Sequence, residues 1–196
     1  MELVSHVLDV YSRIDQEIAA FQLKTGLRCP TGCGLCCPTA DVQTTVIEML
    51  PAAREILYRG ESTPWLERIQ AEGIDSVCVF YQKQSLPHAP GHCSMYTLRP
   101  SVCRLFGFAA VRDRLGAQKL AVCKHLKKSD PDAVAMACKK QGEAPRYTDF
   151  STMLLSLDLT RAHLMPINAA LKEAITRSGL CLQMTHAEAL GNKSAA

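Results

Sequence analysis

The residues of this sequence best suited to chemistry are its cysteines, of which there are ten among 196 residues. Eight of them fall within the first two thirds of the chain, and four of these lie within nine residues. The eight are Cys29, Cys33, Cys36, Cys37, Cys78, Cys93, Cys103 and Cys123. Soft metal ions select thiolate ligands, and a short loop rich in glycine and proline brings several of them together at little cost in chain entropy. The pattern predicts a sulfur-rich metal site.

Two alternative uses of the cysteines explain less. Four thiols as close as those of residues 29–37 would be open to oxidation if left without a metal, which argues against ordinary core residues. A disulfide framework is disfavoured because the chain starts without the features of a secretory signal, and a bridge between Cys36 and Cys37 would be strained. Cys138 and Cys181, by contrast, are expected to be ordinary core residues.

The spacing leaves the identity of the metal open. Cys29, Cys33 and Cys36 loosely satisfy the C-x(2–4)-C spacing of structural zinc, and a tight run of thiolates is equally typical of iron–sulfur ligation. No histidine interrupts the run, so the donors suit iron–sulfur, zinc or copper(I). Cys36 and Cys37 are neighbours that would not easily bind one ion, so one would serve a second metal or a substrate. We favour an iron–sulfur centre, with zinc as the alternative.

No enzyme class is recognised. The spacing Cys29-x3-Cys33-x2-Cys36 also occurs in radical S-adenosylmethionine enzymes. Here, however, the run follows a predicted helix, no Gly-Gly-Glu-like segment follows it, and the chain lacks the strand–helix alternation of a barrel. The sequence also lacks a glycine-rich phosphate loop, a nucleophile elbow and a carboxylate pair with acid/base spacing. Catalytic residues therefore stay unassigned.

Two arginines accompany the later cysteines. Arg99 and Arg104 lie close in sequence to Cys93 and Cys103. Guanidinium groups can neutralise a thiolate-bound metal and donate hydrogen bonds to sulfur, so both arginines are predicted to support the centre without ligating it. Three histidines are candidates for a mixed site, although an exposed role is favoured for each of them: His88, His92 and His125.

Basic residues are concentrated between Leu98 and Lys128, where Asp113 is the single acidic residue. The eight are Arg99, Arg104, Arg112, Arg114, Lys119, Lys124, Lys127 and Lys128. Such an excess could attract an anionic partner. The segment lacks the interleaved aromatic residues of a nucleic-acid site, and the net charge of the chain is only +3, so a nucleic-acid partner is disfavoured.

Hydrophobic periodicity and turn residues predict the elements that must position these side chains. Amphipathic helices are predicted over 2–24, 46–57, 62–73, 130–140, 148–164 and 166–179. Thr45 and Glu48 have the spacing of a capping box, and Pro51 predicts a kink or a restart in the second helix. A short buried strand is predicted over Val77–Tyr81, and a β-hairpin over Phe108–Val122 with its turn at 113–116.

The cysteines also follow a longer pattern. After the cluster that ends in Cys36-Cys37 come Cys78, followed by an aromatic residue, then Cys93-x-Met-Tyr-x2-Arg-Pro-x2-Cys-Arg-x-Phe, and then Cys123. Over about residues 27–125 this pattern resembles the YkgJ-like cysteine-cluster family of zinc- or iron-chelating domains with a CxxCxxCC signature, except that the first gap has three residues instead of two. The resemblance implies that the eight matching cysteines ligate an iron–sulfur or zinc centre.

Together these observations predict a single domain over residues 1–196 with an α+β fold that is mainly α-helical and has a small β-hairpin and a cysteine-rich metal-binding loop. Its cysteine-cluster core would span about 27–125, a helical cap about 130–180, and a frayed tail 185–196. No apolar run approaches the roughly 20 residues that cross a bilayer, so we expect a cytoplasmic protein.

The function we expect is an iron–sulfur or zinc centre used in electron transfer or cofactor handling. The expected partner is then a metal ion. The alternative is a non-enzymatic structural zinc module, which would bind another protein. A metal-dependent enzyme that modifies protein side chains is a third, less favoured, reading.

Overall fold

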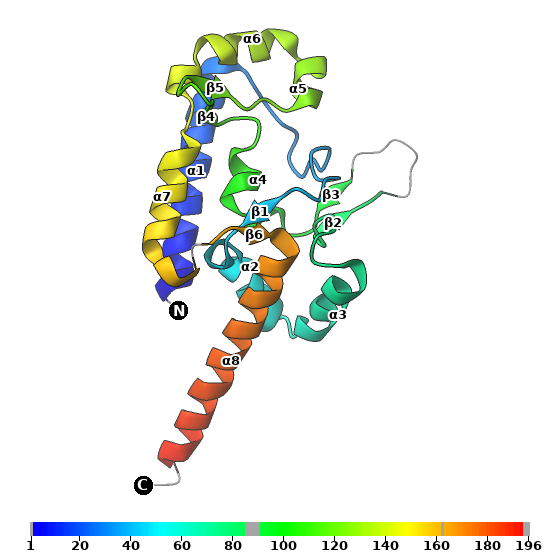
Figure 1. The fold of residues 1–196 in the computed structure, drawn as a ribbon, viewed down its shortest axis with the longest axis vertical. Helices are drawn as coiled ribbons and strands as arrows, with labels where there is room; N and C mark the ends of the chain where they lie inside the picture. The colour runs from blue at the N-terminus through cyan, green and yellow to red at the C-terminus, as the bar shows by residue number, and fades with distance from the viewer. Residues whose placement is uncertain (1, 85–90, 162, 194–196) are drawn as a thin grey trace.

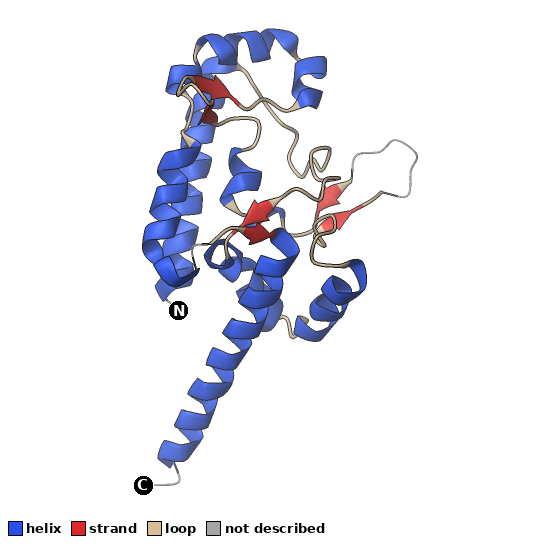
Figure 2. Cartoon of the chain, in the orientation of Figure 1, coloured by secondary structure: helices blue, strands red, loops and turns tan. Residues whose placement is uncertain are grey.

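The chain folds into helices joined by short two-stranded sheets (Figure 2). The computed structural model describes residues 2–84, 91–161 and 163–193, with side chains as far as residue 184. The helices are α1 (Glu2–Thr25), α2 (Val46–Tyr58), α3 (Ser62–Glu72), α4 (Ser101–Leu105), α5 (Lys124–Ser129), α6 (Pro131–Lys139), α7 (Tyr147–Leu157) and α8 (Ile167–Lys193), with 3-10 turns η1 (Tyr96–Leu98), η2 (Gln141–Glu143) and η3 (Leu159–Arg161). The predicted α+β class, mainly helical with a small hairpin, is confirmed.

Three antiparallel strand pairs connect segments of the chain that lie between the helices. They are β1 (Gln43–Thr44) with β6 (Met165–Pro166), β2 (Tyr81–Gln82) with β3 (His92–Cys93), and β4 (Ala110–Arg112) with β5 (Gln118–Leu120). The last pair is the predicted hairpin, whose turn is closed by the carboxylate of Asp113 accepting from two backbone amides. Each pair is short, so side-chain contacts must hold most of the fold together.

The first helix forms as predicted and supplies one side of the core. Val7, Tyr11, Ile14 and Phe21 recur every three or four residues and are all buried, while Gly26 ends the helix with φ 73°. Helix α1 lies beside α7 and also contacts α2 and α4 (Figure 1). Burial of an apolar stripe, rather than helix propensity, therefore fixes the position of α1.

The second helix packs against α8 more extensively than any other two elements pack (Figure 1). Thr45 caps α2 as predicted, its hydroxyl accepting from the amide of Glu48. The predicted restart at Pro51 is wrong, because α2 runs unbroken from Val46 to Tyr58 with Pro51 inside it. Pro51 lacks the N–H of one helical hydrogen bond, and its ring is buried with the rest of this face, which offsets that loss.

Other element boundaries differ from the prediction. Residues 77–80 form a turn in place of a strand, and α7 ends at Leu157, which leaves Leu164 exposed instead of on the helix face. The carboxylate of Asp158 ends α7 because it accepts from the amide and the hydroxyl of Thr160.

The last helix is longer than the hydrophobic pattern predicts. Pro166 belongs to β6 rather than to the first turn of α8, and α8 continues through Gly179 as far as Lys193. The predicted inward face is confirmed, since Ile167, Ala170 and Leu171 are buried. None of the helices in the described ranges is both long and apolar enough to span a bilayer.

Candidate metal centre

All eight cysteines that the sequence identifies as candidate ligands line one cavity of about 320 Å³. They reach it from the loop of residues 29–37, the turn before β2, strand β3, helix α4, and the position just before α5. Cys138 and Cys181 do not line the cavity. Both are exposed, so the prediction that they are core residues is wrong. The fold thus places the eight candidate ligands around the cavity and the other two cysteines outside it.

The thiols surround a space rather than converge on one point. Among the residues that the structure describes, no three His, Cys, Asp or Glu side chains stand close enough together to hold one metal ion. The cavity is roughly ten times the ~30 Å³ that one water molecule takes up in the liquid. Its wall is otherwise mainly apolar, with Leu35, Phe80, Phe106 and Leu126 among its members. The cavity therefore has room for a group of several atoms as well as for a single ion.

Turns and a close backbone contact shape the loop of residues 29–37. The amide of Cys33 donates to the carbonyl of Pro30 at 3.1 Å, and the amide of Cys37 to that of Gly34 at 3.0 Å. The amide of Gly34 in turn donates to the carbonyl of Gly91 at 2.8 Å, beside an isolated bridge between Cys33 and His92. The loop is therefore fixed on the β2–β3 pair, which carries Cys93.

This contact requires glycine. A Cβ atom on Gly34 would lie 2.4 Å from the carbonyl oxygen of Gly91 and 2.9 Å from the amide nitrogen of His92, and neither backbone atom can rotate away. A Cβ on Gly91 would meet the ring of Tyr81 at 2.4 Å. The two glycines let the cysteine loop and the strand pair approach within hydrogen-bonding distance.

We expect Gly34→Ala to lower the free energy of unfolding by about 2 kcal/mol and to weaken metal binding, because the loop must move off the strand pair. Urea denaturation and metal titration measure the two effects. Gly142→Ala is the matched control, since a Cβ there has no atom within 4 Å. Equal behaviour of the two variants would contradict the proposed docking of the loop.

The turn that carries Cys78 is held by a buried amide side chain from α8. Asn168 is fully buried, and its Oδ1 accepts from the amide of Val79 at 3.0 Å. Its Nδ2 donates to the carbonyls of Gly73 and Val77 and to the hydroxyl of Ser76, at 3.1 to 3.3 Å. These hydrogen bonds satisfy backbone groups that a partner strand would otherwise have paired, which explains why residues 77–80 form a turn.

Asn168→Ala is expected to cost about 2 kcal/mol of stability, since it leaves the Val79 amide without its acceptor and removes the amide donor to the carbonyls of Gly73 and Val77. Amide hydrogen exchange at Val79 should become faster, and urea denaturation gives the free energy. Gln70→Ala, an exposed substitution on α3, should change the stability little. Unchanged exchange at Val79 in Asn168→Ala would show that the amide does not position this turn.

Helix α4, which carries Cys103, is positioned by the buried carboxylate of Glu48. Its Oε1 accepts from the amide of Ser101 at 2.9 Å and from the Ser101 hydroxyl, and its Oε2 accepts from the hydroxyls of Thr44 and Thr45 at 3.0 and 3.1 Å. The sequence pattern identifies Glu48 only as part of a capping box. In that motif the carboxylate would bond the cap's own amide, whereas here it joins α2 to α4.

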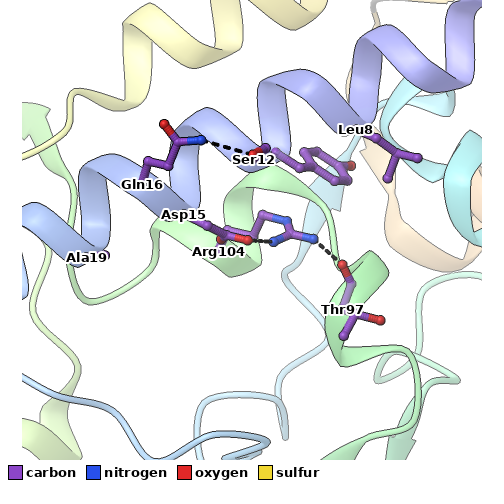
Figure 3. A pocket seen from close by; sticks show the side chains of 8 residues that line it. Leu8, Ser12, Asp15, Gln16, Ala19, Thr97 and Arg104 are labelled. Atoms are coloured by element: carbon purple, nitrogen blue, oxygen red, sulfur yellow. Dashed lines mark hydrogen bonds and ion pairs between the residues drawn. The ribbon is translucent and has the colours of Figure 1, made fainter.

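The two predicted arginines are placed differently. Arg99 lines the thiol cavity, with its guanidinium carbon 3.7 Å from the centre of the Tyr96 ring and a hydrogen bond of 2.9 Å to the Tyr96 carbonyl. Arg104 does not line this cavity. It is buried beside α1, where it pairs with Asp15 at 2.5 Å (Figure 3). Its guanidinium carbon lies 4.4 Å from the centre of the Tyr11 ring.

Arg104 also acts on the segment that carries Arg99. Its Nε donates to the carbonyl of Arg99 at 2.9 Å, and its terminal nitrogen donates to the carbonyl of Thr97 (Figure 3). Arg104 therefore fixes the backbone that presents Arg99 to the cavity, and it does so from outside the cavity wall.

Burial keeps most of the cavity thiols protonated. Desolvation raises the pKa of Cys29 to about 12 and that of Cys78 to about 11, and neighbouring thiols add to the rise at Cys29. The pKa values of Cys93 and Cys103 are also raised, again mainly by burial. A cation entering the cavity would have to displace these protons.

The pKa values of the adjacent thiols of Cys36 and Cys37 shift in opposite directions. A hydrogen bond from the Cys37 thiol to Cys36 lowers the pKa of Cys36 to about 6, with a smaller contribution from the charge of Arg99. The same bond raises the pKa of Cys37, which holds the shared proton. The hydrogen bond thus makes Cys36 the more acidic thiol of the pair.

The described histidines do not line the cavity, although His92 pairs with Cys33 in the isolated bridge. His92 is exposed on β3 and His125 is half-buried after Cys123, and neither lines the cavity. His88 lies outside the described residues. Among the described residues, the cavity wall offers the eight thiols and, besides them, oxygen donors such as the carboxylate of Asp41.

Comparison with known proteins gives one match. A family model with the signature CxxCxxCC, described as "Putative zinc- or iron-chelating domain", matches residues 28–139, which is more than half of the chain. The matched range includes all eight cysteines that line the cavity. No curated protein and no solved structure matches the chain.

Proposed function

Because the chain belongs to the CxxCxxCC family of zinc- or iron-chelating domains, we propose that its cavity thiols hold an iron–sulfur centre used in electron transfer or cofactor handling. The observation that carries this proposal is the convergence of eight thiols from five parts of the chain on one cavity larger than an ion. Metal chelation is the property of the family. The cluster and its use are our inference.

The residues present fit such a group. The four thiols of residues 29–37 would supply inner ligands, and the other four would complete that centre or a second one: Cys78, Cys93, Cys103 and Cys123. Iron–sulfur clusters are held by thiolates, and when bound they exchange electrons at potentials set by charge, hydrogen bonds and exposure. Arg99 in the cavity wall would offset the negative charge of the thiolates, and the apolar wall would limit water.

A zinc module that works through protein interactions is the second candidate. It is favoured by the shortness of the strand pair that holds the cysteine loop, since β2 and β3 contain two residues each. Thiolates bound to zinc from separate segments would then contribute directly to folding.

Analysis of the full chain, purified without oxygen, distinguishes these candidates. The iron–sulfur proposal requires brown protein that contains iron and acid-labile sulfide. Colourless protein with zinc alone would overturn it in favour of the zinc module. Cys138→Ser protein is a suitable control, because its cavity thiols are intact.

Metal binding should strengthen as the pH rises. At neutral pH the thiols of Cys29, Cys78, Cys93 and Cys103 are protonated, since their pKa values are raised, so each bound thiolate releases a proton. The apparent affinity should increase about tenfold per pH unit for each proton displaced. Anaerobic zinc competition with a chromophoric chelator between about pH 6 and pH 8 measures this slope. A flat profile would contradict thiol ligation.

A further inference from the structure

A surplus of cations lies at one end of the molecule, over the β4–β5 hairpin and α5 (Figure 1). Residues 111–140 contain eight basic and three acidic residues, out of 22 and 19 in the whole chain, so the remainder carries 14 and 16. The net positive charge of the protein thus comes from this segment.

Six exposed cations of the β4–β5 hairpin and α5 lack an ion-pair partner anywhere in the described residues: Arg112, Arg114, Lys119, Lys124, Lys127 and Lys128. We call them the basic end. The three acidic residues of the segment, Asp113, Asp130 and Asp132, form no ion pair with these cations within the described residues, and they leave the segment a net charge of +5.

The basic end adjoins the thiol cavity. Cys123 and Leu126, on one side of the α5 segment, line the cavity, while Lys124, Lys127 and Lys128 are exposed. Phe106, which also lines the cavity, is 45 % exposed. A molecule bound to these lysines would therefore lie beside the cavity wall.

Apolar side chains accompany the charges. Leu115, at the tip of the hairpin, is 94 % exposed, and Val111 on β4 is also exposed. A protein interface combines an apolar contact with a polar rim, whereas sites for single-stranded nucleic acid present aromatic side chains for stacking. One exposed leucine also falls short of the apolar area that holds a protein on a membrane surface.

We propose that the basic end is the docking surface for an acidic protein partner, with Leu115 as its apolar contact. Docking there brings the partner beside the thiol cavity. Charge attraction would mainly speed encounter and select the partner. The inference does not depend on which metal the cavity holds.

A photo-crosslinking residue at Leu115 of the full chain, expressed in its own cells, tests this proposal. The expected result is crosslinking to a protein of net negative charge, with no such product from the same probe at Tyr58, which is 88 % exposed on another part of the chain. Binding of that purified protein should fall about tenfold or more when the salt rises from about 0.05 M to 0.3 M.

Charge reversal provides the second arm. Arg112→Glu with Arg114→Glu, and separately Lys128→Glu, should each weaken the purified complex about tenfold without changing metal content. Lys172→Glu, an exposed change on α8, should have no effect. Equal crosslinking at Leu115 and Tyr58, insensitivity to both reversals, or reversal-sensitive binding only to a single-stranded oligonucleotide or to phosphatidylserine vesicles would overturn the proposal.

Discussion

Replacing Cys33, Cys78 or Cys103 by serine is expected to reduce metal affinity more than about tenfold in each case. The three thiols belong to different elements but line one cavity, so each substitution removes a sulfur donor from the same centre. Elemental analysis of protein purified without oxygen, followed by competition with a chelator, measures the loss. No substitution outside the cavity thiols should lower metal affinity more.

Cysteines outside the cavity are the matched controls. Cys138→Ser and Cys181→Ser change the same atom at exposed positions and should keep the full metal content. Loss of metal in these variants, or its retention in all three cavity variants, would rule out the cavity as the metal site.

Comparison of Cys36→Ser with Cys37→Ser adds a finer result, because a variant that keeps its metal identifies a thiol that is not a ligand.

Glu48→Ala is expected to lower the free energy of unfolding by about 4 kcal/mol. The substitution removes the acceptor of the Ser101 amide and of three hydroxyls, all of them buried, and it releases α4 from α2. Because α4 carries Cys103, metal affinity should fall together with stability. Urea denaturation of the metal-free and metal-loaded protein separates the two effects.

Two further substitutions make this prediction specific. Glu48→Gln keeps one oxygen for Ser101 and the shape of the side chain, so it should cost only about 1 kcal/mol. Glu67→Ala removes an exposed carboxylate from α3 and should change stability by less than about 0.5 kcal/mol. If Glu48→Ala costs no more than Glu67→Ala, Glu48 does not hold α4.

The candidate donors could be predicted from the sequence because their chemistry is local. Four thiols in nine residues, separated by glycine and proline, allow few other interpretations. Periodicity likewise predicted α1 and the buried face of α8, since an apolar stripe needs only its own residues to be recognised.

Contacts between distant segments could not be predicted in this way. Glu48 accepts from Ser101, 53 positions away, and Asn168 bonds to Val79, 89 positions away. Asn168 also explains why residues 77–80 form a turn despite their high strand propensity, because its amide saturates the backbone there. Similarly, Arg104 lies next to Cys103 in sequence, but its contacts with Asp15 and Tyr11 hold it beside α1.

We propose that sulfur atoms of the cavity bind the metal. X-ray absorption at the metal edge of the protein, purified without oxygen, tests this claim directly. We predict a first coordination shell of sulfur alone and, for the iron–sulfur centre, a second shell of neighbouring iron atoms. A first shell of nitrogen or oxygen atoms would contradict the account.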